Sequence, residues 1–119
     1  MNKLVSKLLE SRLQSHIFHL RVSGKNAYEA HITLEDYYSS IVDLVDELAE
    51  VYQGKYKLFP FEETYTITND ASLETILQYF QNLAKTVEEF EETDGLLISH
   101  IDDILSLIYK TIYKLKHLK

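Results

Sequence analysis

The stretch that decides the fold spans residues 16–54 and reads HIFHLRVSGKNAYEAHITLEDYYSSIVDLVDELAEVYQG. Apolar residues recur in it every three or four positions, which is the spacing of one face of a helix. Ser23-Gly24 interrupts this spacing, and glycine suits the position just past a helix end. The stretch therefore predicts the end of one helix, a short turn with Asn26 as N-cap, and a long helix from about Ala27 to Gln53 that Gly54 ends.

Three more helices are predicted around this stretch. An apolar row before it predicts a first helix over residues 3–22. Residues 55–71 contain the only proline, Pro60, and a β-branched run, so they predict a long connection. Two more apolar rows predict a third helix over residues 73–90 and a fourth over residues 97–115. The expected end signals are Ser72 as an N-cap, a turn at Thr93-Asp94-Gly95, and the last-turn lysines Lys110, Lys114, Lys116 and Lys119.

This order of elements predicts an all-α fold, a ferritin-like four-helix bundle with one long crossover between the second and third helices. The 119 residues suffice for one domain, residues 1–119, with one core. The chain has no cysteine, which excludes disulfides and thiolate metal sites. No apolar run is long enough to span a bilayer and the N-terminal stretch lacks a signal-peptide pattern, so we expect a cytoplasmic protein with no membrane partner.

Histidines and carboxylates form a row along the central stretch. His31 and Glu35 are one helical turn apart, as are Asp46 and Glu50, so each pair could share a cation. Fifteen positions separate His31 from Asp46, about 22 Å along a helix, so the two pairs cannot share one ion within a chain. Either the chain carries two half-sites, or a second copy packed antiparallel about a twofold axis completes each site. Because the turn after it is short, His19 would join His31.

Neutral imidazoles combined with carboxylates suit ferrous iron, manganese or zinc. The segment His19-Leu20-Arg21-Val22-Ser23-Gly24, followed by His31 and by Asp46-Glu47-Leu48-Ala49-Glu50, resembles the Dps family of mini-ferritins. The resemblance is detailed over residues 13–54 and topological over residues 72–118. It implies metal ligands from two subunits: His19, His31 and Glu35 from one, and Asp46 and Glu50 from its dimer mate.

The resemblance also implies a function. In that family, iron(II) is bound at a ferroxidase site between subunits and oxidised by hydrogen peroxide or oxygen, which protects against peroxide. The ferric product is stored inside a hollow homo-oligomer, often a dodecameric cage. Leu20 stands where the family commonly has tryptophan, and residues 55–71 look too irregular for the family's short crossover helix.

Three functions from different classes stay open. The first is an iron-binding mini-ferritin with ferroxidase activity. The second is a non-catalytic helical dimer or adaptor with a structural or relic metal site, in which His19 and His31 are only interface residues. The third is a DNA-compacting protein, although a net charge of −7 predicts weak DNA binding. Outside these hypotheses, we expect packing, surface or capping roles for His16, Tyr38, His100 and His117.

Overall fold

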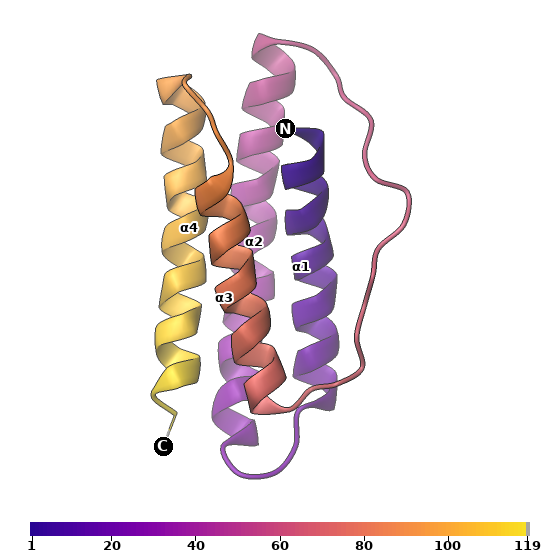
Figure 1. Ribbon diagram of the computed structural model, residues 1–119, viewed down its shortest axis with the longest axis vertical. Coiled ribbons are helices and arrows are strands. Elements are labelled where there is room, and N and C mark those ends of the chain that lie inside the picture. The colour runs from indigo at the N-terminus through magenta and orange to yellow at the C-terminus, as the bar shows by residue number, and fades with distance from the viewer. Residues whose placement is uncertain (119) are drawn as a thin grey trace.

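The structure is a computed structural model that describes residues 1–118. Its four helices are α1 (Asn2–Arg21), α2 (Ala27–Lys55), α3 (Leu73–Glu89) and α4 (Gly95–Lys116), as Figure 1 shows. No strand occurs between residues 1 and 118, so the prediction of an all-α four-helix bundle is confirmed. Lys119, one of the lysines predicted in the last turn, lies outside the described residues.

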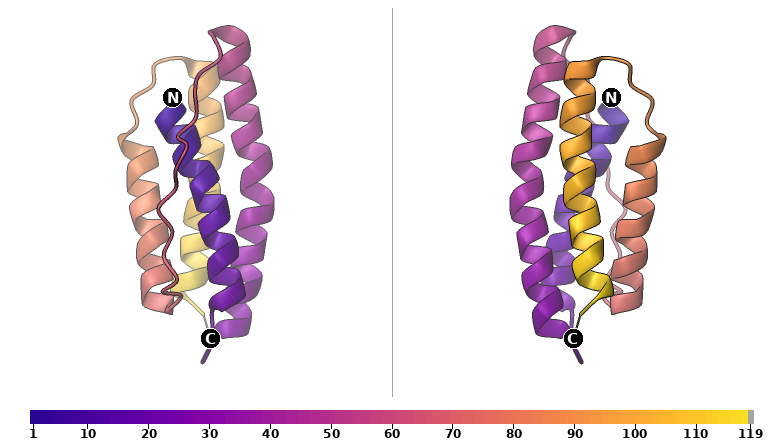
Figure 2. Two further views of the ribbon diagram at one scale, coloured as in Figure 1. Left: turned by 90° about the vertical axis from the view of Figure 1, so that its right-hand side faces the viewer. Right: turned by 90° about the vertical axis from the view of Figure 1, so that its left-hand side faces the viewer.

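The direction of each helix follows the ferritin-like pattern. In Figure 1, α1 descends from the N-terminus, α2 returns antiparallel to it, and residues 56–72 carry the chain back along the length of α1. As a result, α3 runs in the same direction as α2, and α4 descends beside both. Figure 2 shows that the connection passes over the outer side of α1. The predicted long crossover is therefore present, and we call residues 56–72 the strap.

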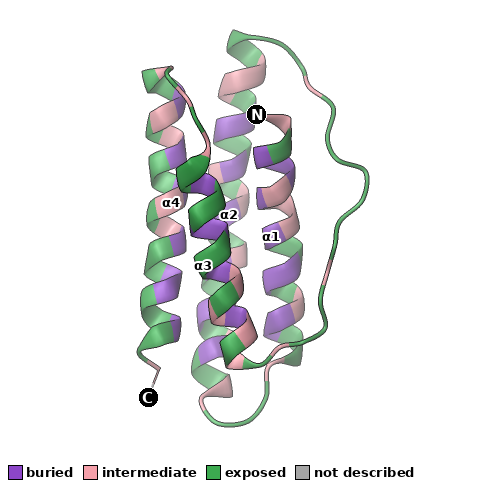
Figure 3. Ribbon diagram, in the orientation of Figure 1, coloured by how far each residue is buried: buried purple, intermediate pink, exposed green. Residues whose placement is uncertain are grey.

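The core is built from the apolar stripe of each helix. Figure 3 shows that the buried residues of each helix face the inside of the bundle, and that the exposed residues lie on its outer surface. Tyr37 on α2 packs edge to face against Phe80 on α3 at 4.8 Å between ring centroids, and both are fully buried. Such aromatic pairs add to the stabilisation that area burial alone provides. Within residues 1–118, none of the helices combines the length and the apolar character needed to cross a membrane.

The structure tests the predicted boundaries of α2 and α3, namely Asn26, Gly54 and Ser72. Ser72 caps α3 by accepting the backbone N–H of Thr75 at 3.2 Å, as expected. Asn26 holds the N-cap position of α2, but its φ of 65° is left-handed and its side chain makes no cap bond. The tight turn from Gly24, whose φ is 90°, imposes this geometry, which asparagine tolerates better than most residues. The helix α2 also continues past Gly54 to Lys55, so the prediction that Gly54 ends it is wrong.

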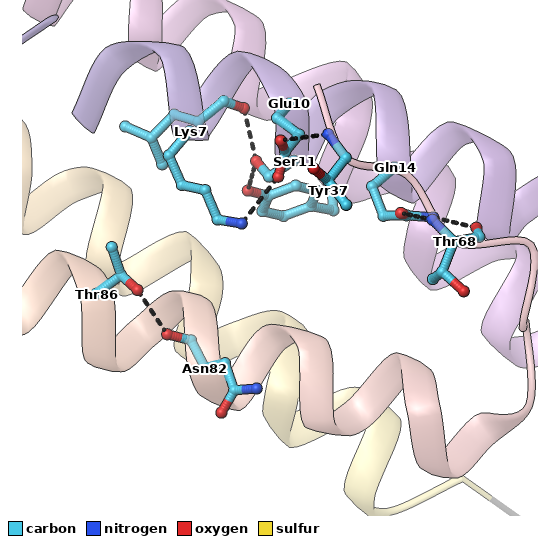
Figure 4. A network of polar contacts seen from close by, with 10 residues as sticks. Lys7, Glu10, Ser11, Gln14, Tyr37, Thr68, Asn82 and Thr86 are labelled. Carbon is cyan, nitrogen blue, oxygen red and sulfur yellow. Dashed lines mark hydrogen bonds and ion pairs between the residues drawn. The ribbon is translucent and has the colours of Figure 1, made fainter. Parts of the chain in front are cut away.

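The strap has no helix of its own and is held by side chains of α1. Ser6, Glu10 and Gln14 lie at successive turns on one face of that helix, and each hydrogen-bonds backbone groups of the strap. Figure 4 shows part of this network, including the two bonds between Gln14 and Thr68. The helix therefore satisfies backbone groups that a neighbouring strand would satisfy in a sheet. The strap bonds are Ser6 to Glu62, Glu10 to Thr66, Gln14 to Thr68, and Arg21 to Asn69.

Candidate metal centre

His19 and His31 meet where α1 ends and α2 begins. The five residues between these helices form a short turn, so the two ring positions face each other across the hairpin. Their rings stack with centroids 3.6 Å apart and planes tilted by 20°. His19 is 8% exposed, and His31 is half-buried. The pair thus lies at the edge of the bundle, where one side remains open to solvent.

Reciprocal hydrogen bonds fix the two imidazole rings. Nδ1 of His19 donates to the backbone carbonyl of His31 at 2.8 Å, and Nδ1 of His31 donates to the carbonyl of His19 at 2.9 Å. A carbonyl only accepts, so each Nδ1 carries a proton, and each Nε2 of a neutral ring keeps a free lone pair. Histidines that ligate metals are commonly oriented in this way, by an N–H bond from the other ring nitrogen.

Two further aromatic side chains surround the pair. Tyr38 on α2 stacks on the exposed His16 of α1 at 4.4 Å and meets His19 edge to face at 5.3 Å between centroids. His16 itself lies 6.0 Å from His19, centroid to centroid. The sequence contained a signal for this cluster, since His16 precedes His19 by three positions and Tyr38 follows His31 by seven. Both offsets place side chains on one face of a helix.

The three predicted carboxylate ligands lie exposed on α2. Glu35 is one turn beyond His31, whereas Asp46 and Glu50 lie on the second half of the helix. Within residues 1–118, no three histidine or carboxylate side chains come close enough together to hold a metal ion. A single chain therefore brings together His19 and His31 only, and a larger ligand set needs groups from outside the chain.

The interior of the bundle offers no alternative site. Its buried polar residues among positions 1–118 include no Asp or Glu. Ser11 donates to the Leu8 carbonyl at 2.6 Å and lies 2.7 Å from the Tyr37 hydroxyl, which therefore donates to Ser11. Burial raises the pKa of Tyr37 and of Tyr79, so both phenols stay neutral. A carboxylate-rich centre between the four helices, the usual ferritin arrangement, is thus absent from the described residues.

The remaining histidines lie away from this centre. Nδ1 of His100 on α4 lies 3.8 Å from a carboxylate oxygen of Glu47, and its side chain is partly exposed. His117 is the C-cap residue of α4, and its backbone N–H donates to the Tyr113 carbonyl at 3.2 Å. Both positions agree with the structural roles expected from the sequence.

The fold and these contacts define a ferritin-like helical bundle with a stacked histidine pair at the edge of its first hairpin. The chain belongs to the family of unknown function DUF5856, which matches residues 19–115. It is similar to the DNA protection during starvation protein of Helicobacter pylori strain J99, with 25% identity over 122 residues that cover 87% of this chain and 85% of that protein. No solved structure matches the chain significantly. The similarity indicates a distant Dps-like relationship.

Proposed function

We propose that the chain is a Dps-like iron-binding protein that oxidises iron(II) at a site shared between two subunits. The observation that carries the proposal is the reciprocal bonding of His19 and His31, which leaves both Nε2 atoms free beside an open face. The proposed ligands are His19, His31 and Glu35 of one copy, with Asp46 and Glu50 of a second copy. Manganese or zinc could occupy the same ligand set.

The exposed face of α2 has the composition that a twofold contact would need. Ser39 and Val42 lie between the two halves of the ligand row, and neither projects a long side chain. If two α2 helices cross antiparallel near Tyr38 and Ser39, each His31 comes opposite the Asp46 turn of the other copy. An isologous contact of this kind produces two identical sites.

The chemistry follows from the ligand types. Hard carboxylate oxygens favour ferric over ferrous iron, so they lower the reduction potential of the bound ion. Two iron(II) ions then give one electron each to hydrogen peroxide, which takes up two protons and becomes two water molecules. Neutral imidazoles hold the ferrous substrate without adding charge. Iron, the oxidant and the ferric product are substrates and cargo in this proposal.

The wider setting is part of the same proposal. A homo-oligomer larger than the pair, up to a dodecameric cage, would enclose space for ferric mineral, and the cytoplasm would supply the iron. The net charge of −7 opposes contact with phosphate, so protection from peroxide would not depend on DNA binding. A gel shift with duplex DNA at low salt, without added divalent metal, should show weak or no binding.

A second function competes for the same observation. The mutual bonds of His19 and His31 tie α1 to α2 and would serve a purely structural role equally well. In that case, the chain is a non-catalytic dimer or adaptor with a structural or relic metal site. With such a protein, iron(II) would be oxidised no faster than in buffer without protein.

Anaerobic titration with iron(II), followed by a pulse of peroxide, tests the proposal. We expect saturable binding and rapid formation of ferric absorbance in the wild type. Asp46→Ala should weaken iron binding and leave the helical circular dichroism unchanged. The matched control is Glu47→Ala, since Glu47 is also exposed but lies about 100° further around the helix. Equal iron affinity in the wild type and both variants would contradict the assignment of Asp46.

A further inference from the structure

The helix α3 ends at Glu89 and α4 begins at Gly95, and the chain between them is extended. Figure 1 shows this segment, residues 90–94, rising from the end of α3 to the start of α4. The last turn of α3 has no basic residue, and it is followed by more carboxylates. The C-terminus of a helix carries partial negative charge, so these carboxylates disfavour another turn.

The early end of α3 leaves a groove beside α4, which we call the α3–α4 groove. Its volume is about 330 Å³, and its apolar lining includes the half-buried Phe90, Ile98 and Leu105. Glu92 and the exposed Glu88 and Asp102 add three carboxylates. Residues 86–103 contain seven carboxylates and no lysine or arginine. The groove is therefore apolar inside and strongly negative around its edge.

The other end of α4 has the opposite character. Residues 104–118 contain three lysines and no carboxylate, and Lys110, Lys114 and Lys116 are all exposed. Tyr113 lies among them with 66% of its surface exposed. We call these four residues the basic tip. This end of α4 is therefore positively charged, although the net charge of the whole chain is −7.

The groove and the tip of one chain cannot meet. Asp102 and Lys116 are 14 positions apart on the same straight helix, which is about 21 Å. The bundle itself is 47 Å long, and the tip lies toward the opposite end from the segment 90–94. Complementary surfaces that are held apart in this way can contact each other only between molecules.

We propose that the basic tip of one copy docks into the α3–α4 groove of another copy. Tyr113 would cover the apolar lining, and the lysines would lie against the carboxylates at the edge. The contact is heterologous, so every copy offers one tip and one groove, and repetition builds a ring where the rotation closes and a filament where it does not. It uses α3 and α4, whereas the proposed metal site uses α1 and α2. The contact deepens the proposed function, since it names the surfaces that would join copies beyond the pair, and it would exist without metal.

Paired charge reversals test the docking by solution mass. The groove variant is Glu89→Lys, Glu91→Lys, Asp102→Lys and Asp103→Lys, which leaves the hydrogen-bonded Glu88 and Glu92 intact and changes the net charge of residues 86–103 from −7 to +1. The tip variant is Lys110→Glu with Lys116→Glu, which leaves the Lys114 pair with Asp36 intact. Each variant alone has like charges on both surfaces and should not dock. In an equimolar mixture, each groove finds an opposite tip, so association should return.

Multi-angle light scattering gives the result for each sample. The wild type should exceed the mass of a pair at low salt and lose mass as salt rises, because exposed charges are screened. The control variant, Lys57→Glu with Glu63→Lys on the strap, should behave as the wild type does. A wild-type mass no larger than a pair, variants with wild-type mass, or a mixture no heavier than its components would each overturn the proposal. Iron titration of the same variants keeps this result separate from that of the metal site.

Discussion

The ammonium of Lys55 lies 2.6 Å from a carboxylate oxygen of Asp94, which joins the last residue of α2 to the N-cap of α4. The Tyr56 hydroxyl donates to the same oxygen at 2.5 Å, and the other oxygen accepts the backbone N–H of Leu96 at 3.0 Å. The Lys55 bond, followed by the Tyr56 bond, lowers the pKa of Asp94 to about 2. The same carboxylate raises the pKa values of Lys55 and Tyr56. One side chain therefore caps one helix and secures the end of another.

This contact predicts a loss of stability in acid. An aspartate in the unfolded chain titrates near pH ~3.9, so the folded state binds fewer protons between about pH 4 and 2. The free energy of unfolding should therefore fall as the pH drops through this window. In Asp94→Asn, the unfolding free energy measured by urea denaturation at low salt should decrease less over this pH range than in the wild type. Asp103→Asn, at an exposed position on α4, should show the wild-type decrease. The same pH slope in Asp94→Asn and wild type would contradict this role for Asp94.

The shared metal site predicts complementation between two inactive variants. His31→Ala and Asp46→Ala each break both sites of their own homodimer. In a mixed dimer, one site receives both changes and the other receives neither. Joint refolding should restore iron oxidation to about a quarter of the wild-type level, since half the dimers are mixed and each has one intact site. Activity that stays at the level of the separate variants, despite proven chain exchange, would leave only half-sites within each chain.

The buried hydroxyl pair of Ser11 and Tyr37 predicts unequal effects of two small deletions. Ser11→Ala leaves the Tyr37 hydroxyl without a partner in the core and should cost about 1–3 kcal/mol of unfolding free energy. Tyr37→Phe leaves Ser11 bonded to the Leu8 carbonyl and should cost about 1 kcal/mol. The double variant should be no less stable than Ser11→Ala, because neither hydroxyl of this pair remains in it. Urea unfolding measures all three, and additive losses would refute the pairing.

Detaching the strap should affect one segment rather than the whole bundle. Gln14→Ala removes the bonds to the Thr68 N–H and carbonyl, at 2.8 and 3.0 Å. Because Thr68 is exposed, water can replace the lost partners, so the unfolding free energy should fall by no more than about 2 kcal/mol. Hydrogen exchange at Thr68 should accelerate, while amides of α4 should keep their protection. Gln81→Ala, at an exposed site on α3, is the control, and equal exchange at Thr68 in both variants would disprove this anchoring role.

Helical periodicity was enough to predict the four helices and the crossover. Long apolar rows at helical spacing, with few glycines or prolines in them, are typical of helices and not of strands. Ser72 could be predicted to begin α3 because a serine hydroxyl can accept a backbone N–H of the first turn. The ends of α2 were harder to predict. The left-handed conformation of Asn26 depends on the turn behind it, and the helix continues through Gly54 to Lys55, whose side chain binds Asp94, 39 positions later.

At the candidate metal centre, too, features set by nearby residues could be predicted, whereas contacts between distant residues could not. The spacing of His19 and His31 across a short turn could be read from the chain, but their exchange of hydrogen bonds depends on how α1 and α2 are rotated. The stack of Tyr38 on His16 depends on the same rotation. The way α1 binds the strap could not be predicted, because each bond joins residues about 50 positions apart and no repeating pattern marks them.

The strap also sets an order of events during synthesis. Gln14 is made early, but its hydrogen-bonding partner Thr68 leaves the ribosome 54 residues later. By then the whole of α2 has been made, so α1 and α2 can pair before the outer side of α1 is covered. The face of α1 that carries Ser6, Glu10 and Gln14 is therefore exposed to water until the strap has been made and covers it. Its serine, glutamate and glutamine can hydrogen-bond water before the strap is made and the strap backbone afterwards.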